Sequence, residues 1–190
     1  MKKRFSIAVV FFLMIKILSG QNSFEGKISM VSEIISSKES SRIDWLIKGK
    51  KCRMDISSKA GEFQNNYRVD VEGPEAKMIV SGRDPITIPS KEKIIGPVIT
   101  ETGMIEKIAG TECKKIIVNH SNGKIEIWMG EIPGLSISDL PEYFSEFYYF
   151  LSPNEKQKLF PFKIIFYDKE NKISSSQEIT SVVKRDSGLR

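Results

Sequence analysis

Apolar and polar side chains alternate with a period of two along most of this chain. Phe24, Ile28 and Met30, for example, alternate with charged or hydroxyl side chains. Because successive side chains of a β-strand point to opposite sides of a sheet, this period is typical of strands that bury one face. We therefore predict strands in the segments 24–30, 42–48, 51–56, 67–71, 77–80, 86–88, 112–119, 124–129, 160–166 and 173–183.

Short turns between these segments favour antiparallel neighbours. Lys48-Gly49-Lys50 predicts a tight reversal, and Ser121-Asn122-Gly123 predicts a hairpin turn, since Asn and Gly both tolerate a positive φ. Residues 94–99 contain Gly96-Pro97, and proline cannot donate in a strand ladder, so we predict a loop or a sheet edge there. The first three segments should form an antiparallel meander.

Residues 139–151 follow a helical period instead. Asp139 can cap a helix, Pro141 suits the first turn, and Glu142 completes a capping box. A second short helix is expected to start at Ser152. The apolar stripe of the first helix consists of Leu140, Tyr143, Phe144, Phe147, Tyr148 and Leu151. The predicted fold class is α+β but mostly β, with one or two short helices covering an antiparallel sheet.

The aromatic side chains of this helix have two interpretations. With Phe160, Phe162 and Phe166 they can form an ordinary core between helix and sheet, which is the commoner arrangement. Alternatively, the helix is a lid over an incompletely filled sheet and leaves an apolar cleft for an acyl chain or a hydrophobic peptide. The mid-strand residues Trp45 and Trp128 fit either interpretation.

The first 20 residues have the pattern of an export leader. Met1-Lys2-Lys3-Arg4 is basic, residues 5–15 are an unbroken apolar run, and Ser19-Gly20 precedes Gln21. A run of this length is typical of a signal peptide and is shorter than a membrane span. We predict a signal peptide at 1–20, a single β-rich domain at 21–184, a flexible polar tail at 185–190, and a periplasmic or secreted protein that is peripheral to a membrane at most.

The charge balance argues against a nucleic-acid partner. Four of the 29 basic residues lie in the predicted leader, which holds no acid, so 25 basic and 24 acidic residues remain. A nucleic-acid binder is expected to carry a clear basic excess or stripe. A remaining chain of this length is typical of a single domain, which we expect to be a monomer.

Cys52 and Cys113 leave two interpretations open. In an oxidising compartment they could form a disulfide, which in the chain-entropy model contributes roughly 4 kcal/mol for a loop of this length. The alternative is two separately buried thiols, which pack as small hydrophobes. We favour the separate thiols, because pairing does not follow from sequence.

Motifs for catalysis and for metals are missing from the sequence. The chain has one histidine, His120, beside the predicted hairpin turn, and no nucleophile elbow or phosphate-binding glycine loop. Two cysteines and one histidine do not supply a zinc site of ordinary spacing. We therefore predict a non-enzymatic protein without a metal or a cofactor.

Several segments together resemble a known family. They are Phe24-Glu25-Gly26-Lys27-Ile28, Ile43-Asp44-Trp45-Leu46-Ile47-Lys48-Gly49, Ala109-Gly110-Thr111-Glu112-Cys113-Lys114-Lys115 and Gly123-Lys124-Ile125-Glu126-Ile127-Trp128. In this order they resemble a domain-of-unknown-function branch of the LolA/LolB-like superfamily, the outer-membrane lipoprotein carriers. The likeness covers most of residues 24–184.

The resemblance implies a strongly curved antiparallel sheet, an incomplete barrel, whose mouth is covered by helices and whose apolar cavity holds acyl chains. The sequence departs from the carriers because its clearest helix comes late and no residue matches their lid-latching arginine. We expect an extracytoplasmic protein that binds a lipid or lipidated peptide, with an envelope protein-interaction module with a fully packed core as the alternative. The candidate ligand-binding residues are Trp45, Trp128, Tyr143, Phe144, Phe147, Tyr148 and Phe162.

Overall fold

A computed structural model describes residues 24–72, 75–80, 83–88, 98–121, 123–136, 140–141 and 158–184. The predicted leader and tail lie outside these residues. The same holds for the predicted helix at 139–151, of which the structure describes only Leu140 and Pro141, both buried. The described chain contains strands and no α-helix, so the covering helices remain a prediction.

Eleven strands follow one another along the described chain. They are β1 Glu25–Ile34, β2 Glu39–Lys48, β3 Lys51–Ala60, β4 Phe63–Glu72, β5 Glu75–Val80, β6 Ile86–Ile88, β7 Val98–Ile108, β8 Thr111–His120, β9 Gly123–Glu131, β10 Leu159–Tyr167 and β11 Ile173–Lys184. All ten segments that alternate in the sequence lie within or overlap these strands, so the mostly β prediction is confirmed.

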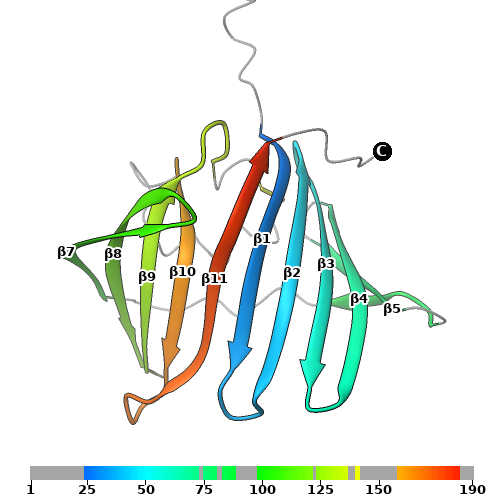
Figure 1. Cartoon of the computed structure of the whole chain (residues 1–190), viewed down its shortest axis with the longest axis horizontal. Coiled ribbons are helices and arrows are strands. Elements are labelled where there is room, and N and C mark those ends of the chain that lie inside the picture. Colours follow the sequence, from blue (N-terminus) through cyan, green and yellow to red (C-terminus); the bar gives the residue numbers. More distant parts are fainter. Residues whose placement is uncertain are drawn as a thin grey trace, which may run out of the picture.

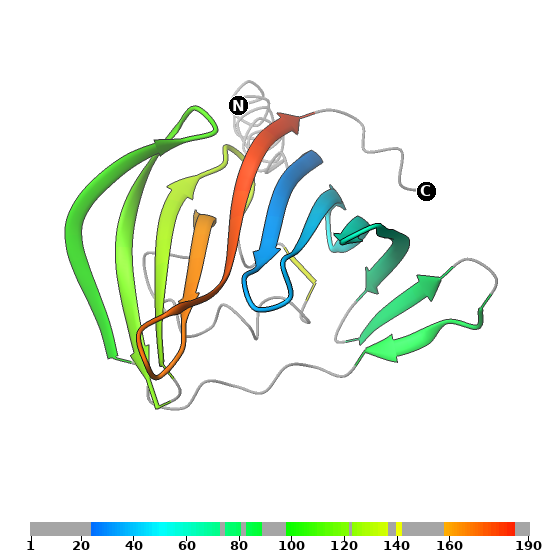
Figure 2. The same ribbon diagram turned by 60° about the horizontal axis from the view of Figure 1, so that its bottom comes forward.

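The strands form one antiparallel sheet in the order β6-β5-β4-β3-β2-β1-β11-β10-β9-β8-β7. Two meanders therefore meet where β1 pairs with β11, at the centre of the sheet (Figure 1). Figure 2 shows that the sheet curves into an open arc, with β7 near one end and β5 and β6 near the other. The sheet is thus curved, as the family resemblance implies, and it is not closed into a barrel.

One face of the sheet is apolar and the other is polar, because the register pairs apolar residues with apolar residues on neighbouring strands. Ile28 pairs with Trp45, and Trp45 pairs with Met54, so apolar side chains continue across the same face. Lys27 and Asp44 lie on the opposite face. We call the side of Ile28 and Trp45 the inner face and the side of Lys27 the outer face.

A contact between distant strands shows that the inner face is concave. Trp45 of β2 and Phe160 of β10 meet edge to face with ring centroids 6.2 Å apart. In the sheet order β1 and β11 separate these two strands, which places them roughly 14 Å apart on a flat sheet. Curvature toward the apolar side brings the rings together, and both residues are buried.

The predicted turns are confirmed where the structure describes them. The β2–β3 connection is Gly49-Lys50, with Gly49 at φ 55°, and the β8–β9 hairpin places Gly123 at φ 144°. A Cβ atom at position 123 would clash with the carbonyl oxygen of Tyr167. Glycine is required there both for the backbone conformation and for the approach of β10.

β7 is longer than the sequence predicts. The segment 94–99 is expected to be a loop or a sheet edge; residues 94–97 lie outside the described residues, and from Val98 to Ile108 the chain forms a strand at the edge of the sheet. Its pairing with β8 breaks between Glu101 and Ile105, and Gly103 adopts φ 71° at this bulge. The bulge hides the strand from pattern analysis, because it shifts the alternation by residues that pair with nothing.

Candidate functional site

An apolar row crosses the inner face from the centre of the sheet to its open β6 edge. In register, Ile28 is followed by Trp45, Met54, Val69, Met78 and Ile86 on successive strands. Ile28 and Trp45 are buried, Met54 and Met78 are partly buried, and Ile86 is 49% exposed. The row therefore runs from the buried core to solvent without a polar interruption.

Neighbouring inner-face positions widen this apolar surface. The parallel row on one side contains Ile47, Cys52, Val71, Ala76 and Ile88, and the row on the other side contains Ile43, Ile56, Tyr67 and Val80. Toward the β3–β4 turn the inner face becomes polar, where buried Ser58 donates a hydrogen bond to Glu39. The apolar surface is thus limited to the half of the face that contains Trp45.

The structure separates the candidate residues that were predicted from sequence. Trp45 lies in the apolar row, and Phe162 is fully buried in the core. Tyr143, Phe144, Phe147 and Tyr148 lie outside the described residues, so the structure neither joins them to Trp45 nor separates them from it.

The placement of Trp128 in an apolar cleft with Trp45 is not what the structure has. Trp128 pairs with Lys115 and Lys163, and the ammonium groups of these lysines lie 4.8 Å and 5.1 Å from the centre of its ring. Lys163 belongs to the outer face, since it pairs with Glu178 and Glu178 pairs with Val31. The indole is therefore buried under cations on the outer face, where cation–π attraction stabilises it.

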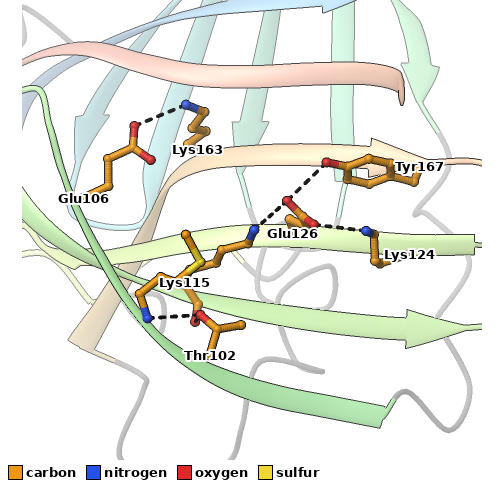
Figure 3. Close-up of polar contacts among 8 residues, drawn as sticks. Thr102, Glu106, Lys115, Lys124, Glu126, Lys163 and Tyr167 are labelled. Carbon is orange, nitrogen blue, oxygen red and sulfur yellow. Dashed lines mark hydrogen bonds and ion pairs between the residues drawn. The ribbon is translucent and has the colours of Figure 1, made fainter. Parts of the chain in front are cut away.

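The buried carboxylate of Glu126 binds three side chains on the outer face of the sheet (Figure 3). Glu126 receives Lys115 Nζ at 2.8 Å and Lys124 Nζ at 3.0 Å, and the hydroxyl of Tyr167 donates to it at 3.2 Å. Lys124 also lies 4.0 Å from the centre of the Tyr167 ring. The cluster, which we call the Glu126 cluster, joins β8, β9 and β10.

Within the Glu126 cluster the pKa of Glu126 is lowered and the pKa of Tyr167 is raised. Burial alone raises the pKa of Glu126, but hydrogen bonds and positive charge from Lys115 and Lys124 outweigh it and hold the pKa below the usual glutamate value. Burial, together with the charge and the hydrogen bond of Glu126, raises the pKa of Tyr167. The carboxylate is thus held charged and the phenol neutral.

β7 is fastened to the outer face beside this cluster. Glu106 Oε1 of β7 lies 3.3 Å from Lys163 Nζ of β10 (Figure 3). Glu178 Oε2 lies 3.2 Å from the same lysine atom. The Thr102 hydroxyl at the bulge donates to the Lys115 carbonyl oxygen at 3.0 Å. Burial alone lowers the pKa of Lys163, but the two glutamates raise it above the usual lysine value, so Lys163 stays charged and holds the edge strand.

Both cysteines are free, buried thiols. Cys52 lies on the inner face of β3, and Cys113 lies on β8 in the other half of the sheet. Burial raises the pKa of the Cys113 thiol to about 11 and raises the pKa of the Cys52 thiol further. Neither is a thiolate at neutral pH, so neither is activated as a nucleophile.

The described residues lack a metal-binding cluster. No three His, Cys, Asp or Glu residues among them are grouped so that they could hold a metal ion. The described residues also form no helix that is long and apolar enough to cross a membrane.

Sequence comparisons do not assign this chain to a family. No protein-family model matches it, and no curated protein does either. Solved structures do resemble it, although the sequence identity is only about 10%.

A conserved uncharacterised protein from Thermus thermophilus has a TM-score of 0.54 at 9% identity, covering 93% of this chain and 88% of that one. A chain of the Pseudomonas aeruginosa MucA/MucB complex has a TM-score of 0.52 at 10% identity, covering 90% of this chain and 55% of that one. This chain therefore spans about half the length of the Pseudomonas protein. These likenesses show a shared fold.

The resemblance to the lipoprotein carriers is supported only in part. A domain classed with outer membrane lipoprotein-sorting proteins, from Vibrio parahaemolyticus, is also similar, at 9% identity and a TM-score of 0.35. A score this low carries no argument about the fold. What the comparisons support is the open antiparallel sheet shared with the Thermus and MucB-complex structures.

Proposed function

We propose that this chain is a non-enzymatic extracytoplasmic binding protein that holds a hydrophobic ligand, a lipid acyl chain or a lipidated peptide, against the inner face of its sheet. The observation that carries the proposal is the apolar row from Trp45 to Ile86. The export-leader pattern of residues 1–20 motivates the location.

The row has the properties that an acyl chain requires. It spans β2 to β6, which is roughly 19 Å at the usual strand spacing and comparable with an extended acyl chain. Its two methionines, Met54 and Met78, are partly buried and can adapt their side chains to a flexible ligand. The exposed Ile86 marks the open edge as the point of entry, and the polar Glu39 and Ser58 limit the ligand to the apolar half of the face.

The chain offers a direct test because its two tryptophans lie on opposite faces. Trp128→Phe leaves Trp45 as the sole tryptophan, and Trp45→Phe leaves Trp128. A brominated fatty acid quenches indole fluorescence only at short range. We expect saturable quenching in Trp128→Phe and none beyond the free-indole control in Trp45→Phe. Equal quenching in both variants, or none in either, would contradict the proposal.

A charge placed in the row should prevent binding. Met78→Lys puts an ammonium group on the partly buried inner face, whereas Ile79→Lys puts the same group on the outer face one residue away. In the Trp128→Phe background we expect Met78→Lys to abolish saturable quenching and Ile79→Lys to retain it. If both variants still bind, the row is not the site.

A protein partner at the β7 edge is the second candidate function. Val98, Met104 and Ile105 of this edge strand are exposed by 63%, 57% and 58%. A chain of similar fold was solved in the MucA/MucB complex, which is a complex of two proteins. Recovery of one stoichiometric partner that is lost in a Met104→Asp, Ile105→Asp variant, with no lipid bound, would favour this function over ligand binding.

A further inference from the structure

The outer face of β2–β5 carries a depression of about 480 Å³ that belongs neither to the inner apolar row nor to the Glu126 cluster. Its volume lies within the range usual for small-molecule sites. By register, the side chains of Arg42, Asp44, Asp55, Ser57, Asn66 and Arg68 lie on this face and line it.

The two carboxylates of the depression are already neutralised by neighbours. Asp44 accepts hydrogen bonds from Lys27 Nζ at 2.8 Å and from Ser29 Oγ at 2.7 Å. Burial alone raises the pKa of Asp44, but these two groups and the charge of Arg42 hold it below the usual aspartate value. Asp55 faces Arg53 Nε at 3.4 Å. Each carboxylate therefore has a cation partner, Lys27 or Arg53, that does not line the depression. Within the depression, Arg42 Nε lies 3.7 Å from Asp44, and Arg68 is the cross-strand neighbour of Asp55.

The guanidinium groups of the depression keep most of their donors available. Arg42 touches Asp44 only at 3.7 Å, and its side chain is 67% exposed. Arg68 is exposed, and its side chain makes no hydrogen bond or ion pair with any residue that the structure describes. Asn66 lies beside Arg68 on β4, two residues away on the same face, and adds an amide donor. The groups of the depression that are still available for hydrogen bonds are therefore mainly N–H donors, and most of these donors carry positive charge.

We infer that this depression is a binding site for a small oxyanion, a carboxylate or a phosphate, held between the guanidinium groups of Arg42 and Arg68. Planar guanidinium groups present paired N–H donors that match the oxygens of both anions. Both arginines lie on the face of the sheet opposite the proposed hydrophobic ligand, although Ile56 and Tyr67 of the inner face also border the depression.

Backbone NMR shifts test this site. The 15N-labelled protein is titrated with sodium phosphate and, in a separate arm, with sodium succinate, at an ionic strength fixed with sodium chloride. We expect the amides of Ser57, Asn66 and Arg68 to shift and saturate in at least one arm. The arm that saturates identifies the class of anion, and saturation in neither overturns the inference.

Variants on the same face separate a built site from general charge attraction. Arg68→Gln should weaken binding about tenfold, as expected for loss of a charge-assisted hydrogen bond. Arg42→Gln is a second variant with the same expected direction. Lys77→Gln removes an equal charge from the outer face of β5 outside the depression and should leave binding unchanged. An equal effect of Lys77→Gln and Arg68→Gln, or no effect of either arginine variant, overturns the inference.

Discussion

Gly26 shows how closely the two halves of the sheet approach each other at β1 and β11. A Cβ atom at this position would clash with the carbonyl oxygen of Val183, and it would lie 2.8 Å from Phe24 Cζ. Because a backbone atom cannot move aside without disturbing the ladder, we expect Gly26→Ala to lower the free energy of unfolding by about 1–3 kcal/mol. Urea denaturation measures this, with the exposed Ser40→Ala of β2 as control. Equal midpoints for the two variants would contradict this packing.

The charge of Glu126 stabilises the outer face of the sheet, because it pairs with two lysines. Glu126→Gln keeps the shape but leaves Lys115 and Lys124 without their shared anion, so we expect a loss of about 1–3 kcal/mol at pH 7. Since the folded pKa of Glu126 lies below its unfolded value, its contribution is complete above the unfolded pKa and is lost as pH falls through the folded pKa.

The difference in stability between wild type and Glu126→Gln should therefore be constant near neutral pH and shrink in acid. Thermal or urea unfolding at several pH values measures it. A difference that grows as the pH falls would show that the carboxylate is not stabilised by these lysines. Tyr167→Phe, which removes only the phenol hydroxyl, should cost less than Glu126→Gln at every pH tested.

At the scale of elements, β7 lies at the edge of the sheet beside β8, and its ladder is interrupted at the bulge, so it should open before the rest of the sheet. Glu106→Gln removes the charge that pairs with Lys163, and Glu106 is 45% exposed, so the effect on global stability should be small. We expect faster hydrogen exchange of the amides of 105–108 with unchanged exchange in β1 and β2. Uniformly faster exchange would mean that β7 and the core open together.

The strands show which parts of the architecture follow from sequence alone. Alternation locates every strand except β7, where polar residues 100–102 and the Gly103 bulge interrupt the pattern. The alternation also indicates the face on which Trp128 lies. Trp128 is two and four residues from Glu126 and Lys124, so it lies on the same, polar face of β9. The prediction of Trp128 as a cleft residue rests on its mid-strand position, which does not distinguish one face of the sheet from the other.

The apolar row and the outer depression could not be predicted in the same way. Each depends on the register between strands, which places Trp45 beside Met54 and Arg42 beside Ser57. A shift of one residue in one strand would put those side chains on opposite faces. Sequence periodicity gives the faces of single strands, and turn lengths only partly fix how the strands align.

At the scale of the whole molecule, the central pairing of β1 with β11 joins sequence-distant halves into one sheet. A chain that ends at residue 172 lacks β11 and so loses this junction. We expect it to unfold without a cooperative transition, because neither remaining meander can bury the apolar inner face alone. Circular dichroism during heating measures this, and a sharp transition like that of the full chain would contradict it.

Native mass spectrometry of the protein without residues 1–20 tests the central claim, that the curved apolar face holds a hydrophobic ligand, most directly. The account predicts an added mass of an acyl-containing molecule, either as purified or after incubation with a fatty acid. The same mass should be absent from Met78→Lys and present in Ile79→Lys. A bare protein mass under all these conditions, from a chain that is folded, would contradict the account.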